Sequence, residues 1–362
     1  MGAPMKLFPF ILFCILICNI NTFSQQINPK LSQTLKEALN TVIANEKINA
    51  FAVLKDRYPV DNLLKKSSFL SKKEKRKELV GALKEFASTK QKNVMAFLRD
   101  AQKKGKVNKI ANLWSLNTIA FSADPDVIKT LADNFREIKE IRYDGRLNKK
   151  LDKSEKSLSL NKTMSFDDYT IDPGLTIMNV EEVWEAGYKG QGILVASIDE
   201  GFGWGHPDLV NHIWNNLGED ADGDGHTIEW DGSKWVYDPG DINGIDDDGN
   251  GYVDDFIGWN CENENNTFDQ LDHGSLSAGI IVGDGTLGIK TGVVPEAKVI
   301  FIQVGDNDHT LQTYMWEAMQ YAIDRGVDVI TASQSYHFEL VDDLDISMFR
   351  DLAVLELQAG IR

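Results

Sequence analysis

Cysteine is scarce in this sequence of 362 residues, which contains three. Cys14 and Cys18 lie in one apolar run near the N-terminus, and Cys261 has no second cysteine to pair with in the rest of the chain. This composition excludes a secreted fold that depends on disulfide bonds. Cys261 also lacks a CxxC motif or a nearby Cys/His cluster, so we interpret it as a buried or loop thiol rather than a nucleophile.

Positive charge is scarce in the second half of the chain. Residues 166–362 contain 7 Lys and Arg against 39 Asp and Glu, whereas residues 1–165 contain 31 against 16. A strongly acidic surface repels phosphate, which excludes nucleic acid as a partner of this half. The asymmetry predicts two parts of the chain with different roles.

Long apolar runs are also scarce, and residues 7–18 form the one that stands out. This run follows Lys6 and is too short to span a bilayer comfortably. Thr22 and Ser24 then offer small side chains at the −3 and −1 positions of a cleavage site. We therefore predict a signal peptide over residues 1–24, a secreted or cell-surface protein, and no membrane span after cleavage.

Residues 27–157 are rich in lysine and alternate between helical and extended patterns. The order of these patterns suits a small α+β domain, and residues 158–176 are predicted to be a linker. The predicted elements are helices at 71–88, 92–102 and 126–135, extended chain at 109–122 and a strand at 138–143.

From residue 177 the pattern is that of an α/β fold. Short apolar runs at 193–198, 298–304 and 327–332 are typical of buried parallel strands, and residues 313–325 have helical spacing. Strand, helix and strand in this order predict βαβ units and a parallel sheet with flanking helices.

Two residues stand where a parallel sheet would form a site. Asp199 ends the first apolar run, and Gly201 and Gly203 let the chain turn away so that the carboxylate faces a crevice. His273 begins a segment of small residues, HGSLSAG, which predicts a helix that packs closely against its neighbour. Taken singly, a turn-capping aspartate and a surface histidine are the simpler interpretations.

Taken together, these segments resemble the subtilisin-like serine proteases (subtilases). Asp199-Glu200-Gly201 followed by HPDL at 206–209 is similar to the family's D-[ST]-G and H-P-D-L block, and HGSLSAG is similar to its H-G-T-H-V-A-G block. GVVPEA at 292–297 and GVDVI at 326–330 resemble two further blocks, in the same order. The resemblance implies a subtilisin-like parallel sheet over residues 177–362 and serine-type hydrolysis of peptide bonds.

The resemblance also implies roles for individual residues. Asp199 would be the orienting acid and His273 the general base of a Ser-His-Asp triad that acts on peptide or protein substrates. Ser333, Gln334 and Ser335 would line the substrate cleft and pair with an extended peptide. Residues 27–157 resemble, in place and pattern, the propeptide that blocks the cleft of such enzymes as an intramolecular inhibitor.

The sequence also departs from the family pattern. The G-T-S-x-[AS] block that carries the nucleophilic serine and the oxyanion asparagine motif are absent. In the family order both would follow residue 362, so we expect a truncated, N-terminal part of a catalytic domain with negligible proteolysis by this chain. Glu200, Leu276 and Ser277 differ from the usual residues, and Ser335 stands where the family favours glycine.

Two acidic stretches predict a calcium site. One spells D-x-D-x-D-G and the other D-x-D-x-N-G. Alternate carboxylates on a tight turn suit a hard cation such as Ca²⁺, although no EF-hand is implied and a solvated acidic loop is the alternative. The candidate ligands are Asp220, Asp222, Asp224 and Asp231 in the first stretch and Asp246, Asp248, Asn250 and Asp254 in the second.

Three functions are compatible with these patterns. The first is a secreted subtilisin-like endopeptidase, represented by its signal, propeptide and part of its catalytic domain. The second is a non-catalytic, calcium-dependent binding module on a decayed protease scaffold. The third is an inhibitor or chaperone of the propeptide type, which would require residues 27–157 to bind a protease in trans.

Overall fold

The computed structural model describes residues 28–43, 46–67, 69–147, 170–305, 310–333 and 344–362. The predicted signal peptide, most of the predicted linker, and Gln334 and Ser335 lie outside the described residues. Among the helices that are described, none is long and apolar enough to cross a membrane.

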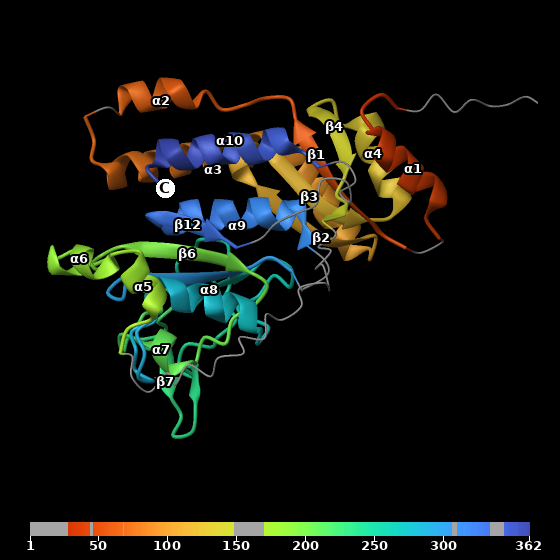
Figure 1. Cartoon of the computed structure of the whole chain (residues 1–362). Coiled ribbons are helices and arrows are strands. Elements are labelled where there is room, and N and C mark those ends of the chain that lie inside the picture. Colours follow the sequence, from red (N-terminus) through yellow and green to blue (C-terminus); the bar gives the residue numbers. More distant parts are fainter. Residues whose placement is uncertain (1–27, 44–45, 68, 148–169, 306–309, 334–343) are drawn as a thin grey trace, which may run out of the picture.

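The N-terminal part is built on a four-stranded antiparallel sheet in the order β2-β3-β1-β4. Figure 1 shows this sheet at one end of the molecule, with α1 and α4 beside it. Its elements are α1 (Gln33–Thr41), β1 (Ile48–Leu54), α2 (Val60–Lys66), α3 (Lys72–Lys103), β2 (Val107–Leu113), the short 3₁₀ turn η1 (Trp114–Leu116), β3 (Thr118–Ala123), α4 (Pro125–Asn134), β4 (Ile138–Tyr143) and β5 (Arg146–Leu147).

Helix α3 is one continuous helix of 32 residues, and the prediction of two helices was wrong here. It begins at a capping box in which the Ser71 hydroxyl accepts from the Glu74 N–H and the Glu74 carboxylate accepts from the Ser71 N–H. No glycine or proline interrupts residues 88–92, and the buried Gln91 donates to the Asn117 side chain at 3.3 Å. Since nothing there breaks the helix, it runs through.

Strand β1 shows how the antiparallel sheet separates two cores. Successive side chains of a strand point to opposite faces. Ala50, Ala52 and Leu54 therefore pack beneath α1, α3 and α4, while Phe51 and Val53 face the second part of the chain. Both faces of this sheet are covered.

The C-terminal part is an α/β unit. A four-stranded sheet in the order β12-β6-β10-β9, all strands parallel, forms its centre. Its elements are α5 (Pro173–Ile177), α6 (Val180–Glu185), β6 (Leu194–Asp199), α7 (Pro207–Val210), β7 (Ile228–Trp230), β8 (Trp235–Tyr237), β9 (Gly258–Asn260), α8 (Asp272–Val282), β10 (Lys298–Gln303), β11 (Thr310–Leu311), α9 (Gln312–Arg325), β12 (Val329–Ala332) and α10 (Ile346–Ala359).

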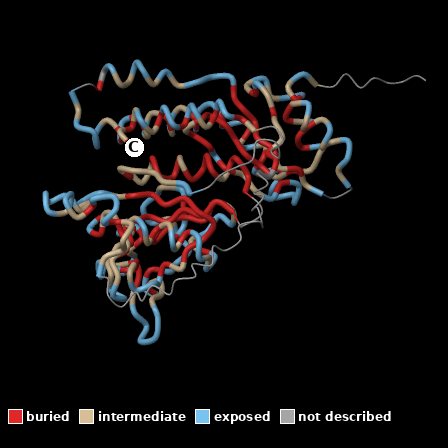
Figure 2. The backbone as a smooth tube through the Cα atoms, in the orientation of Figure 1, coloured by how far each residue is buried: buried red, intermediate tan, exposed pale blue. Residues whose placement is uncertain are grey.

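The predicted α/β fold class is confirmed: β6, β10, α9 and β12 lie within two residues of the ranges expected from the sequence. Helix α5 begins inside the range predicted as linker, because Leu175 is buried and the Asp172 N–H donates to the Lys290 carbonyl at 2.9 Å. Figure 2 shows the central strands buried and the tip of the β7–β8 hairpin exposed.

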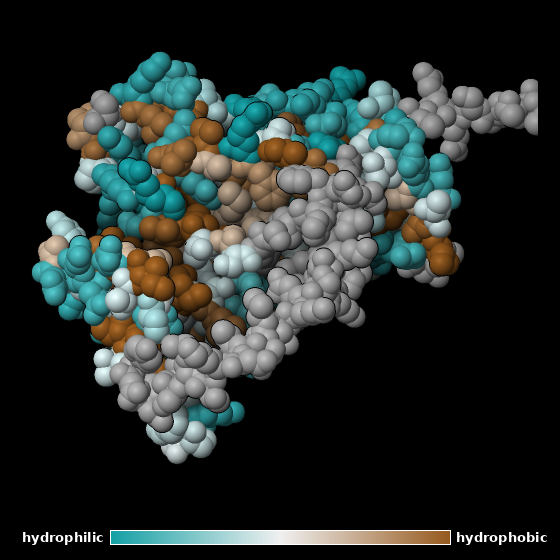
Figure 3. Space-filling model, viewed as in Figure 1, coloured by the Kyte–Doolittle hydropathy of each residue, from teal (hydrophilic) through white to brown (hydrophobic). Residues whose placement is uncertain are grey.

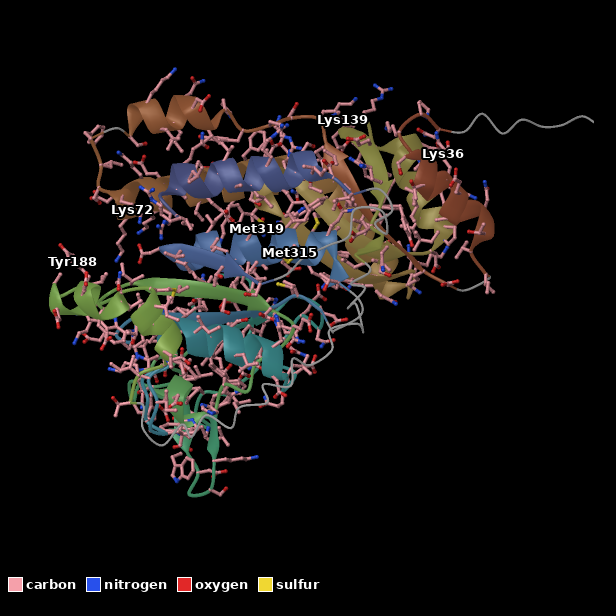
Figure 4. All side chains as sticks on the ribbon, viewed as in Figure 1. Lys36, Lys72, Lys139, Tyr188, Met315 and Met319 are labelled. Carbon is pink, nitrogen blue, oxygen red and sulfur yellow. The ribbon has the colours of Figure 1, made fainter. Side chains whose placement is uncertain are left out.

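The two parts share a hydrophobic core. Helices α9 and α10 lie between the two sheets (Figure 1), and Phe51 of β1 meets the Trp316 ring of α9 edge-on at 5.0 Å between centroids. Met315 of α9 belongs to the core of the parallel sheet, and Met319 packs against both cores (Figure 4). Burial of this apolar surface holds the two parts together.

Charge also crosses this boundary in one direction. Among the described residues, the ion pairs that join the two parts all take their cation from the N-terminal part and their anion from the C-terminal part. They include Lys72–Asp328 at 3.1 Å, beside α3 and β12 (Figure 4), Lys84–Asp324 at 2.7 Å and Arg142–Asp345 at 2.6 Å. The unequal distribution of charge along the chain thus becomes electrostatic complementarity.

Candidate active site and acidic loops

Asp199 and His273, which are 74 residues apart in the chain, meet at the carboxyl end of β6. The Asp199 Oδ1 atom lies 2.7 Å from His273 Nδ1 and also accepts the Glu200 N–H at 2.8 Å. The Asp199 side chain is buried, whereas the His273 side chain is 48% exposed. One ring nitrogen is therefore held by a buried carboxylate while the ring itself reaches solvent.

Small residues bring the two side chains together. A Cβ atom at Gly274 would lie 2.1 Å from the Gly201 carbonyl oxygen, so only glycine allows α8 to approach the chain that follows β6. The Ser275 hydroxyl accepts the Gly203 N–H at 2.7 Å, and the Phe202 N–H donates to the Asp269 carbonyl at 2.7 Å. These contacts fix the position of His273 relative to Asp199.

The predicted substrate residues are described only in part. Ser333 is exposed and follows the last residue of the edge strand β12, and Gln334 and Ser335 lie outside the described residues. A separate two-residue strand of the C-terminal part, the buried β11, pairs antiparallel with β5 of the N-terminal part. An extended segment of the same chain is thus added as a strand next to α9.

A groove of about 770 Å³ runs along α8, and its lining includes Asp272, the residue before His273, but neither Asp199 nor His273. The lining also includes Leu276 and Ile280, which are 67% and 60% exposed, and His206. Figure 3 shows apolar surface gathered around α5 and α8 on this side of the molecule. The helix that carries His273 therefore presents an apolar face to solvent.

The first acidic stretch divides between two clusters. Asp220 and Asp222 lie with Asp241, and Asp224 lies with His226 and Asp238; within each cluster the ligand atoms are within 4.8 Å of one another. Asp231 lies apart, because its carboxylate accepts the Ser233 and Lys234 N–H groups at 2.8 Å and closes the turn of the β7–β8 hairpin.

The second acidic stretch contributes Asp248 to a third cluster, with Glu219 and Asp255. Burial raises the pKa of Glu219 to about 7 and that of Asp255 to about 6. Arg325 lies in this cluster, 2.9 Å from Asp248 and 3.7 Å from Asp255. A cation from the chain itself therefore offsets part of this charge.

The other predicted ligands of the second stretch are used by the loop backbone. Asp246 accepts the N–H groups of residues 250 and 251, Asn250 accepts the Tyr252 N–H, and Asp254 accepts the Gly244 N–H. Motif spacing missed Glu219, His226, Asp238, Asp241 and Asp255. Glu219, next to the first motif, and Asp255, next to Asp254, could have been found by adjacency, whereas Asp241 follows a hairpin that the sequence pattern did not reveal.

Comparison with known proteins gives this geometry a family. Residues 190–345 match the sequence model of the subtilase family of peptidases. This range contains both Asp199 and His273 and all three acidic clusters.

Curated relatives are similar over the same region. Subtilisin-like protease 1 of Plasmodium berghei is 28% identical over 215 residues, which are 58% of this chain and 32% of the relative. Bacillopeptidase F of Bacillus subtilis is 26% identical over 255 residues, 69% of this chain and 16% of the relative. The chain thus spans a third or less of the length of these relatives.

Solved structures that match in part include the epidermin leader peptide processing serine protease of Staphylococcus aureus, with 16% identity and a TM-score of 0.43 over 87% of this chain and 58% of that one. Fervidolysin from Fervidobacterium pennivorans has 15% identity and a TM-score of 0.42, over 88% and 40% respectively. The sequence match rather than these structures carries the comparison: residues 190–345 match the subtilase family model, and the curated relatives include subtilisin-like proteases, as the motifs indicated.

Proposed function

We propose that this chain supplies the acid and the base of a serine endopeptidase. The observation that carries the proposal is the 2.7 Å contact between the buried Asp199 carboxylate and Nδ1 of a half-exposed His273. With Nδ1 protonated and donating to Asp199, Nε2 is left to accept the proton of a serine hydroxyl. Asp199 would then stabilise the imidazolium that forms.

The nucleophile is assigned to no residue described above. The sequence contains no G-T-S-x-[AS] block and no oxyanion asparagine motif. The residues from Ser333 to Ser335 are proposed to pair with an extended peptide substrate, since Ser333 follows the exposed end of an edge strand. We also propose, from the sequence, that residues 1–24 are a signal peptide and that the protein is secreted or lies at the cell surface.

The N-terminal part is proposed to act as an intramolecular inhibitor. Its last described residues form β5, which occupies the edge of β11, and the Thr313 hydroxyl donates to Asp144 at 2.5 Å just beyond that edge. An extended peptide could not use the β11 edge while β5 is paired with it. We also propose that the acidic loops hold calcium, whose oxygen ligands these carboxylates would supply.

The first test determines which nitrogen of His273 carries the proton in the chain of 362 residues. Nitrogen-15 NMR of the histidine side chains should show His273 with its proton on Nδ1, and Asp199→Asn should abolish that preference. The matched control is Asp284→Asn, which removes the carboxylate 3.1 Å from His212 Nε2 and should alter His212 alone. A His273 signal that ignores Asp199→Asn would contradict the proposal.

The second test is enzymatic. The chain of 362 residues should release no peptide from casein above background, because it contains no nucleophile block. A product of the same gene that includes a G-T-S-x-[AS] segment should cleave casein, and Asp199→Asn should lower its kcat by about 10⁴-fold. Full activity in that variant would refute the assigned role of Asp199.

A further inference from the structure

Three buried polar side chains stand side by side at the carboxyl end of the parallel sheet. Asp199 ends β6, Gln303 ends β10 and Asn260 ends β9, and Gln303 is the register partner of the other two. All three residues are fully buried. Because successive side chains of a strand alternate between faces, register partners on neighbouring strands share a face. The ends of the strands therefore present one row of polar groups.

This row holds the segment that leads into α8 at three points. From β9 through β10 to β6, the contacts are Asn260 to the Thr267 carbonyl at 2.8 Å, Gln303 to Asp269, and Asp199 to His273 at 2.7 Å. The segment of residues 267–273 thus lies across the ends of three neighbouring strands. The last contact is the candidate catalytic pair, and the middle one has no role in the proposed function so far.

Gln303 holds Asp269 by two hydrogen bonds. Its Oε1 atom accepts the Asp269 N–H at 2.9 Å, and its Nε2 group donates to Asp269 Oδ2 at 2.5 Å. The Asp269 carbonyl accepts the Phe202 N–H at 2.7 Å, and a Cβ atom at Gly201 would lie 2.4 Å from that carbonyl oxygen. Asp269 therefore joins the end of β10 to the chain that follows β6, four residues before His273.

The chemistry of this contact requires an amide at position 303. The Asp269 N–H needs an acceptor and the Asp269 carboxylate needs a donor. A glutamate would repel the carboxylate, a lysine would leave the N–H without an acceptor, and an apolar residue would satisfy neither group. Gln303 lies in the apolar run KVIFIQV, where a buried amide costs free energy that its hydrogen bonds must offset.

We infer that Gln303 is a positioning residue for His273 and acts through Asp269. Helix α8 begins at Asp272 without a side-chain cap, so its start depends on the segment before it. By holding Asp269 on the sheet, Gln303 keeps His273 at hydrogen-bond distance from Asp199. A displacement of about 1 Å in a catalytic group can lower the rate about 10²-fold. This inference rests on the proposed endopeptidase function.

The first experiment measures the tautomer of neutral His273 by nitrogen-15 NMR in the chain of 362 residues. Gln303→Met removes both hydrogen bonds at similar side-chain volume, and Asp269→Ala removes the carboxylate at an exposed residue. Each variant should lower the ratio of Nδ1-protonated to Nε2-protonated His273 about tenfold, the effect of losing one charge-assisted hydrogen bond. The matched control Gln91→Met removes another buried amide, in α3, and should leave that ratio unchanged.

A rescue experiment separates positioning from a general loss of stability. Gln303→Glu places a carboxylate against that of Asp269 and should lower the ratio. Adding Asp269→Asn reverses the polarity of the contact, because the new amide donates to the new carboxylate, which still accepts the N–H of residue 269. The double variant should recover most of the wild-type ratio. Failure of the double variant to improve on Gln303→Glu would count against a specific hydrogen-bonded contact.

The outcomes distinguish this inference from the proposed function. A wild-type His273 that shows no preference for Nδ1 overturns both. A wild-type preference that Gln303→Met and Asp269→Ala leave intact overturns the role of Gln303 alone; if Gln303→Met does not fold, the exposed variant Asp269→Ala decides. In a product of the same gene that includes a G-T-S-x-[AS] segment, Asp269→Ala should lower kcat by 10- to 100-fold with KM within about twofold. An unchanged kcat would likewise overturn the inference.

Discussion

Lys109 of the N-terminal part makes several polar contacts with the other part. Its ammonium lies 4.2 Å from the centroid of the Tyr314 ring, donates to the carbonyls of Cys261 and Glu262, and is 4.0 Å from the Glu317 carboxylate. Burial raises the pKa of Glu317 to about 7, and the charge of Lys109 opposes that rise. Lys109 therefore offsets part of the free-energy cost of burying the ionised Glu317 carboxylate.

Lys109→Met should lower the free energy of unfolding by about 3 kcal/mol at pH 8, because it leaves the ionised Glu317 buried without a cation. Urea unfolding measures this change. The double variant Lys109→Met/Glu317→Gln should recover most of the loss, whereas Lys106→Met, which removes an exposed lysine of the same region, should change little. Equal losses in the single and double variants would show that the ion pair is not the cause.

At the scale of single residues, the Asp199–His273 pair could be predicted from the sequence, because both residues lie in motifs that resemble those of the subtilases. The roles of Lys109 and Asp241 were not predictable in the same way. The contacts of both residues join segments that are more than a dozen residues apart in the chain, and neither Lys109 nor Asp241 itself lies in a motif. Burial, which decides whether such a charge matters, depends on how the two parts pack.

Helix α8 has two faces with different consequences. Gly274 and Ala278 are buried against the core, while Leu276 and Ile280 line the groove and are more than half exposed. Exposed apolar side chains on one helix favour association between molecules. Replacing both by glutamine, a good helix former, should reduce aggregation of the purified chain and change the free energy of unfolding by less than about 0.5 kcal/mol.

Light scattering at increasing protein concentration measures the first effect, and urea unfolding the second. The control is Leu209→Gln, in the same groove but 2% exposed, which should destabilise the chain instead. If the double variant aggregates as much as the wild type, a surface other than this face of α8 causes the association.

Elements with a strong local signal were predictable. The strands β6 and β10 are short apolar runs, and β4 was expected at the residues where it is found. The continuous helix α3 and the β7–β8 hairpin were not, because a polar stretch in the middle of a helix and a hairpin of three-residue strands leave weak patterns. Tertiary contacts, such as that of Gln91 with Asn117, decide such cases.

At the scale of the whole molecule, the boundary between the two parts contains titratable groups. Asp144 lies in it fully buried, with the Thr313 hydroxyl as a donor at 2.5 Å. Burial raises the pKa of Asp144 from 3.8 to about 7, and Glu317 behaves alike. At a pH between the unfolded and the folded pKa values, Asp144 and Glu317 hold protons in the folded chain that they have released in the unfolded chain.

Stability should therefore fall as pH rises from about 4 to 7, by up to about 1.4 kcal/mol per pH unit for each such group. The contribution of Asp144 is fully present below the unfolded pKa and lost as pH passes the folded one. Urea unfolding across this range should show a shallower slope for Asp144→Asn. Asp126→Asn is the control, because Lys106 lowers rather than raises the pKa of that exposed carboxylate. If Asp144→Asn kept the wild-type slope of the free energy of unfolding against pH, another group would bind the proton assigned to Asp144. The burial of Asp144 between the two parts would then not cause the pH dependence.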